Sequence, residues 1–198
     1  MDSINAQSEL AFIKKVIADS RTAIIDDGKE LIVWGLLVVI GMLTMYFAMQ
    51  FDYKISKLLL WATLIGIGCV YTTVNYFQSR KKKRFATFGG KILGSLWLGC
   101  GIVMTIIGFI APFTGAVKPW AIVPMTSLVI GVGYLVTGVI HDDRWTRLSA
   151  IGWWLGAIVM LLWPGYYMFL LFAAMMIVFQ IFPGIKLYHQ WKSQHASE

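Results

Sequence analysis

The sequence predicts an all-α fold, a polytopic membrane protein with six transmembrane helices preceded by an amphipathic N-terminal helix. Of its 198 residues, 58% are hydrophobic and 14% are charged, which excludes an ordinary soluble surface. Six apolar runs are present: five have 19 or 20 residues, about the length that crosses a hydrocarbon core of roughly 30 Å, and the fifth is shorter, with 15. None of these runs contains Asp, Glu, Lys or Arg, so proton-coupled carriers, voltage sensors and proteases with paired intramembrane aspartates are disfavoured.

Residues 1–29 are expected to form a cytoplasmic amphipathic helix that ends at Gly28. Apolar residues recur on one face at helical spacing: Leu10, Ile13, Ile17 and Ile24. Charged residues of both signs occupy the other face: Lys14, Lys15, Asp19, Arg21 and Asp26. This pattern favours contact with the membrane interface or with a partner protein.

The transmembrane domain is expected at residues 30–186, followed by a cytoplasmic polar tail at 187–198. The six predicted spans are 31–49, 58–77, 92–111, 121–140, 149–163 and 166–185. Residues 149–185 form a run of 37 residues, which is too long for one helix. The turn residues Pro164 and Gly165 divide it into the fifth and sixth spans.

Lys and Arg are distributed unequally between the two sides of these spans. Fourteen fall in the N-terminal segment, the tail and the loops on one side, and three fall on the other: Lys54, Lys57 and Lys118. By the positive-inside rule, both termini are expected in the cytoplasm. Aromatic belts are then expected at both interfaces. The cytoplasmic belt would contain Trp34, Trp97, Trp145, Trp153, Trp154 and Trp191, and the outer one Trp61, Trp120 and Trp163.

Five consecutive cations form the loop between the second and third spans: Arg80, Lys81, Lys82, Lys83 and Arg84. A nucleic-acid partner is disfavoured because the loop is short and tethered to the membrane at both ends. Juxtamembrane clusters of this kind are attracted to anionic headgroups. We therefore expect the loop to fix the topology and to contact anionic lipid.

Two spans share a sequence pattern that suggests an internal repeat. The segment IGIGCVYTTV in the second span aligns with IGVGYLVTGV in the fourth at an offset of 65 residues, and the first, third and fifth spans each place Trp near Gly. The pattern predicts three like-oriented helical hairpins, as in several transporters with parallel repeats. Chance similarity between segments of low complexity is the alternative.

The candidate ligand or pathway residues are the midplane glycines and the polar residues of the even-numbered spans: Gly66, Gly68, Thr72, Asn75, Gly131, Gly133, Thr137, His141 and Gln180. Each glycine pair either lets neighbouring helices approach from opposite sides, which would make both spans central, or marks an unwound helix that lines a pathway. The polar residues either line a vestibule or lie at the wet ends of their helices. Gly152 and Gly156 favour helix packing within the chain or a homo-oligomer.

A histidine and two carboxylates adjoin only in HDDRW, residues 141–145. Adjacent residues in a short loop seldom converge on one metal ion, and Asp142 and Asp143 are expected to pair with nearby Arg residues. Recognisable nucleophile, phosphate-binding and zinc motifs are absent from the sequence. We therefore expect no enzyme activity, no cofactor and no metal.

Two segments carry a resemblance to known proteins: SRTAIIDDGKELIVWG (residues 20–35) and GWWLGAIVMLLWPGYYMFLLF (residues 152–172). They resemble small uncharacterised bacterial polytopic membrane proteins with six helices. The resemblance implies a bacterial inner (plasma) membrane and supplies no catalytic residue.

These observations favour a noncatalytic membrane module that binds a partner protein or a lipid at its cytoplasmic face. A small transporter or channel, with a pathway near the midplane glycines, is the alternative.

Overall fold

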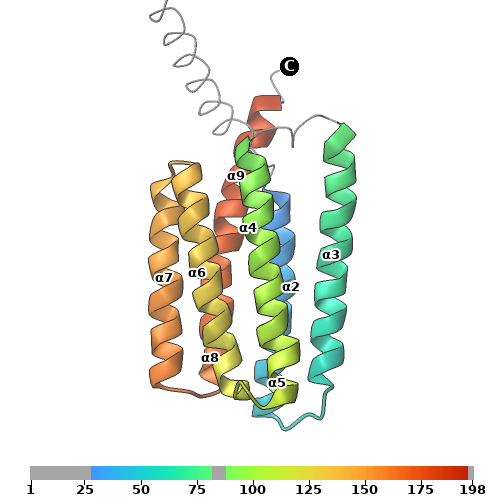
Figure 1. Cartoon of the computed structure of the whole chain (residues 1–198), viewed down its shortest axis with the longest axis vertical. Coiled ribbons are helices and arrows are strands. Elements are labelled where there is room, and N and C mark those ends of the chain that lie inside the picture. The colour runs from blue at the N-terminus through green and yellow to red at the C-terminus, as the bar shows by residue number, and fades with distance from the viewer. Residues whose placement is uncertain (1–27, 82–87, 196–198) are drawn as a thin grey trace, which may run out of the picture.

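The computed structural model describes residues 28–81 and 88–195, and their fold is a bundle of helices (Figure 1). Within these residues, six helices are long and apolar enough to cross a membrane. They span Lys29–Gln50, Lys57–Gln78, Gly89–Thr114, Pro119–Ile140, Arg144–Leu162 and Tyr167–Ser193. The expected N-terminal helix and the loop residues 82–84 lie outside the described residues.

The six spans are built from the following elements. The first two are α2 (Lys29–Gln50) and α3 (Lys57–Lys81). The third comprises α4 (Phe88–Thr105), the π-helical turn η1 (Ile106–Ile110) and α5 (Ala111–Thr114). The fourth joins the short 3₁₀ turn η2 (Pro119–Ala121) to α6 (Ile122–Ile140), and the fifth is α7 (Arg144–Leu162). The sixth comprises α8 (Tyr167–Met176), the π-helical turn η3 (Ile177–Ile181) and α9 (Phe182–His195).

Each π-helical turn ends two residues before a proline. Proline has no N–H to donate to the carbonyl four residues earlier, and its ring clashes with that carbonyl. For Pro112 and Pro183 these carbonyls belong to Gly108 and Phe179, which lie within η1 and η3. Each span therefore widens locally into a π turn and continues as a helix.

The helices pack unevenly. The α6 helix packs most extensively on α7, α2 packs on α8, η3 and α9, and α3 packs chiefly on α2. In Figure 1, α3 and α7 stand at opposite sides of the bundle. The second and fourth spans were both expected to be central. This is confirmed for Pro119–Ile140, in which 44% of the most apolar 18-residue stretch is buried, and wrong for Lys57–Gln78, in which 6% of the corresponding stretch is buried.

The core forms around Trp153 of α7, which is fully buried. Its ring centroid lies 5.2 Å from that of Phe172, 6.0 Å from that of Phe179 and 6.1 Å from that of Tyr134. The expected place of Trp153 in an interfacial belt is therefore wrong. Burying so large a ring among aromatic neighbours stabilises the packing of α6, α7 and α8.

Two glycines of α7 receive side chains from the sixth span. A Cβ at Gly152 would collide with the ring of Phe179, and one at Gly156 would collide with Met175. The structure thus uses this GxxxG pair for packing within the chain.

Candidate functional site

A cleft of about 3200 Å³ runs along the bundle, and we call it the central cleft. It is lined by α2, α3, α4, α6 and the sixth span, and by α7 only at its start. Its two ends are the His141 end, at the turn between α6 and α7, and the Pro164 end, at the turn between α7 and α8. Pockets for small molecules hold about 300–1,000 Å³, so the central cleft suits a larger ligand.

On one wall, Trp34 of α2 holds α3. Its indole Nε1 donates a hydrogen bond of 2.9 Å to the Oγ1 of Thr72. The ring lies over Gly68, where an added Cβ would be 2.6 Å from the Cη2 of Trp34. The glycine thus makes room for the indole, and the threonine one turn later binds its N–H.

The same arrangement recurs on the other wall. The Nε1 of Trp97, from α4, donates a hydrogen bond of 3.2 Å to the Oγ1 of Thr137 in α6. Its ring lies over Gly133, where an added Cβ would be 3.0 Å from the Cη2 of Trp97. Both indole N–H groups are therefore bound within the protein.

The two walls use matching positions of their helices. Residues 65 apart, in α3 and in α6 with its C-cap residue His141, both line the central cleft: Ile65 and Ile130, Cys69 and Tyr134, Thr72 and Thr137, Tyr76 and His141. The sequence similarity has the same offset. A shift of one residue would turn one helix by about 100° and break this match.

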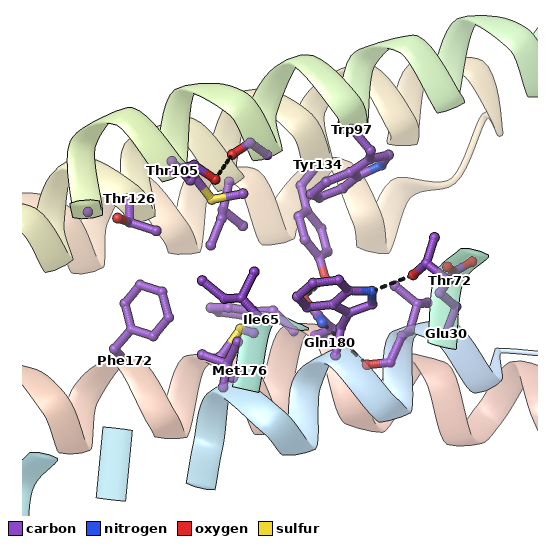
Figure 2. A pocket seen from close by; sticks show the side chains of 18 of the residues that line it. Glu30, Ile65, Thr72, Trp97, Thr105, Thr126, Tyr134, Phe172, Met176 and Gln180 are labelled. Carbon is purple, nitrogen blue, oxygen red and sulfur yellow. Dashed lines mark hydrogen bonds between the residues drawn. The ribbon is translucent and has the colours of Figure 1, made fainter. Parts of the chain in front are cut away.

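Two buried side chains, Tyr134 and Gln180, form a line of hydrogen bonds across the cleft between its walls. The hydroxyl of Tyr134 donates a 3.3 Å hydrogen bond to the Oε1 of Gln180, whose Nε2 donates one of 3.3 Å to the carbonyl oxygen of Leu31. Figure 2 shows the Tyr134 and Gln180 side chains directed toward one another, with Trp97 beside Tyr134. These two hydrogen bonds connect α6, η3 and α2 inside an otherwise apolar region.

Charged groups gather at the His141 end. Three lysines from different helices line the cleft there: Lys29, Lys91 and Lys186. The ammonium group of Lys29 lies 5.4 Å from the ring centroid of Trp191 and 5.7 Å from that of Tyr188, so aromatic faces hold it against α9. Two carboxylates, Glu30 and Asp143, also line this end.

The turn at this end perturbs two titratable groups. Burial lowers the pKa of His141, and the charge of Asp143 opposes that effect. Burial raises the pKa of Asp143, but hydrogen bonds from Thr146 and Trp145 and the charge of Lys186 outweigh it, so the pKa is lowered overall. Near neutral pH, His141 is therefore neutral and Asp143 ionised.

Asp142 and Asp143 make local contacts. Asp142 forms a 3.4 Å ion pair with Arg147, and Asp143 accepts a 2.7 Å hydrogen bond from the backbone N–H of Thr146. Within the part of the chain that the structure describes, no three His, Cys, Asp or Glu residues are grouped to hold a metal ion.

The remaining predicted site residues fall in different places. Gly66 faces open space, Gly131 lies under Trp154 of α7, and Asn75 lines the central cleft. Gly66 and Gly131 lie within helices that run without a break, so an unwound segment is not found at either glycine. Arg80 and Lys81 end α3, and the rest of their cluster lies outside the described residues.

Sequence reasoning missed the roles of Trp34, Trp97 and the three lysines. The sequence predicts a belt position for the two tryptophans, and the lysines contribute to its predictions only through the charge bias. The sequence does contain a signal for the tryptophans. The span that follows each of them carries a Gly and a Thr four residues apart, Gly68 and Thr72 after Trp34, and Gly133 and Thr137 after Trp97.

Comparison with protein families, with curated proteins and with solved structures finds no match for this chain.

Proposed function

We propose that this chain is a noncatalytic, multi-pass protein of a bacterial inner membrane that binds an anionic membrane lipid in the central cleft. The observation that carries the proposal is the division of the cleft, which is apolar along most of its length and bears three lysines against two carboxylates at the His141 end. Acyl chains would occupy the apolar part, and the headgroup would lie among Lys29, Lys91 and Lys186.

The orientation of the chain supports this assignment. From the bias of 14 Lys and Arg against three, we expect the His141 end and both termini in the cytoplasm. Anionic lipids of the cytoplasmic leaflet attract basic side chains near the surface by about 1 kcal/mol per residue. The loop cations Arg80 to Arg84 would add to the attraction at the same end.

The internal repeat also supports it. Two Trp–Gly–Thr arrangements and a common 65-residue offset relate the walls, as expected if α2–α3 and α4–α6 are like-oriented hairpins. The third hairpin, α7 with the sixth span, would close the back of the cleft. Because α7 packs so extensively on α6, the cleft opens toward lipid between the first two hairpins.

Lipid binding can be tested on the full chain in detergent. Native mass spectrometry would compare phosphatidylglycerol, which is anionic, with zwitterionic phosphatidylcholine of the same acyl chains. We expect preferential retention of phosphatidylglycerol and a loss of about fivefold in its affinity for each of Lys91→Gln and Lys186→Gln. Lys57→Gln is the matched control, because Lys57 also lines the cleft but begins α3 at the Pro164 end.

Equal binding of the two lipids, or equal loss in Lys57→Gln and Lys91→Gln, would contradict the proposal. Capture of a partner protein by the cleft in place of lipid would also contradict it, since the lysines would then serve a different ligand.

A transport pathway is the second candidate. It is favoured by one observation, that the cleft is lined at both its His141 and Pro164 ends. Solute flux into liposomes, abolished by closing the cleft with bulky residues at Gly94 and Gly101, would support it over simple binding.

A further inference from the structure

Two threonine hydroxyls of the central cleft, those of Thr72 and Thr137, make different hydrogen bonds from four other threonine hydroxyls of the bundle. The hydroxyls of Thr44, Thr73, Thr105 and Thr126 each donate to the carbonyl four residues earlier in their helix, at 2.7–2.8 Å. Thr72 and Thr137 instead use their oxygens to accept the indole N–H groups of Trp34 and Trp97. Across residues 28–81 and 88–195, neither hydroxyl proton has an acceptor.

Both hydroxyls line the central cleft. A hydroxyl can donate one hydrogen bond while it accepts others, so the indole fixes each oxygen and leaves its proton to be donated into the cleft. An unpaired donor in an apolar region is costly. A ligand with an acceptor at this position would therefore gain a hydrogen bond and would also remove the free-energy cost of leaving the hydroxyl donor unpaired.

The two donors occupy equivalent places on opposite walls. They belong to the two Trp–Gly–Thr arrangements, and they are related by the 65-residue offset. In α2, Trp34 lies five residues after Lys29, and in α4, Trp97 lies six residues after Lys91. These separations correspond to about 8–9 Å along a helix. The cleft is thus layered, with lysines at the His141 end, then a pair of hydroxyl donors, then apolar surface.

A diacyl glycerophospholipid has the same layers. Its phosphate is outermost, its two ester carbonyls follow on the glycerol, and two acyl chains extend below them. We infer that the ligand of the central cleft is a lipid of this class, whose two ester carbonyls accept hydrogen bonds from Thr72 and Thr137. The inference rests on the proposed function, and it specifies the linkage between the chains and the headgroup.

The decisive comparison needs no substitution. Diester phosphatidylglycerol and its diether analogue have the same headgroup and equal chains, but the diether has no carbonyl. The unaltered chain in detergent, titrated with each lipid and followed by native mass spectrometry, is expected to bind the diester about tenfold more tightly, since each hydrogen bond contributes about two- to tenfold.

Variants assign the effect to the two hydroxyls. Thr72→Val with Thr137→Val should bind both lipids at the level of the diether, whereas Thr72→Ser with Thr137→Ser keeps the hydroxyls and should retain the preference for the diester. Thr126→Val is the matched control, because Thr126 also lines the cleft but donates to the carbonyl of Ile122. It should leave the preference unchanged, and the melting temperature of each variant reports on its fold.

The outcomes separate this inference from the proposed function. Equal affinity of the unaltered chain for diester and diether, with the dependence on Lys91 and Lys186 retained, would overturn the inference and leave the lipid site standing. A diester preference that survives the double valine change would overturn it too. Failure of both lipids to bind saturably would overturn the proposed function itself.

Discussion

Glycines in matching sequence positions have different roles here, because their neighbours differ. Gly66 and Gly131 are 65 residues apart and begin the same GxG pattern. Gly131 receives the ring of Trp154, whose Nε1 donates a 3.3 Å hydrogen bond to the carbonyl of Leu128. Gly66 has no heavy atom within 4 Å of an added Cβ. The role of each glycine is thus set by the helix that faces it.

This difference gives a prediction for single methyl groups. Gly131→Ala should lower the free energy of unfolding by about 1–3 kcal/mol, because the methyl would push Trp154 out of its place. Gly66→Ala is the control, and it should leave stability unchanged or raise it by up to about 1 kcal/mol through helix propensity. Denaturant titration in mixed micelles measures both, and equal effects would show that the two sites are packed alike.

At the scale of elements, the turn between α6 and α7 holds together the most extensively packed pair of helices. Asp142 adopts a left-handed conformation with φ of 54°, which carbonyl-bearing side chains tolerate better than most. Asp143 then caps α7 by accepting from the N–H of Thr146. One carboxylate thereby satisfies an end group of the helix that contains Trp153.

The cap should depend on pH. Because the pKa of Asp143 is lowered in the folded chain, its stabilisation is present above the unfolded pKa of about 3.9 and is lost as the pH falls through the lowered value. Asp143→Ala should cost about 1 kcal/mol at pH 7. The difference from the unaltered chain should shrink in acid.

Asp143→Asn is the matched control, because asparagine caps a helix without titrating. It should keep the stability at pH 7 and lack this acid-dependent loss, as measured by unfolding at pH 7, 5 and 3. A cost of Asp143→Ala that stays constant down to pH 3 would contradict a cap made by the ionised carboxylate.

At the scale of the whole molecule, the helices divide into a tightly packed part and a loosely attached one. The α6–α7 pair, the sixth span and α2 enclose the core, while α3 is held chiefly by α2. The central cleft exists because α3 and α4 each contact one partner closely and are little buried otherwise. A ligand between them would bury surface that the fold leaves open.

The orientation of the whole chain is testable by labelling. In intact cells, a cysteine introduced as Lys82→Cys should react with a membrane-impermeant maleimide only after permeabilisation, because the loop with most cations remains inside. Lys118→Cys, in the loop between the third and fourth spans, is the matched control and should react directly. The reverse pattern would invert the bundle and assign the lysines of the cleft to the outer leaflet.

Much of the fold was accessible from the sequence, because a helix in lipid must satisfy its own backbone and bear an apolar surface. The six spans could be counted from the positions of the apolar runs in the sequence. Pro164 and Gly165 marked the break between α7 and α8. The π turns were not predicted, although Pro112 and Pro183 supply their local cause. The burial of Trp153 was not predicted either, because an aromatic residue near a span end has the same sequence pattern whether it faces lipid or a neighbouring helix.

By itself, the sequence determined the number and the apolar character of the spanning helices, since these follow from the positions of apolar runs and the thickness of a membrane. Only the tertiary structure decided which glycines lie under tryptophans, which threonines keep a hydroxyl proton to donate, and where the helices leave a cleft. Apolar helices are chemically alike on all sides, so the choice of neighbour depends on how side chains fit across an interface between segments far apart in the chain.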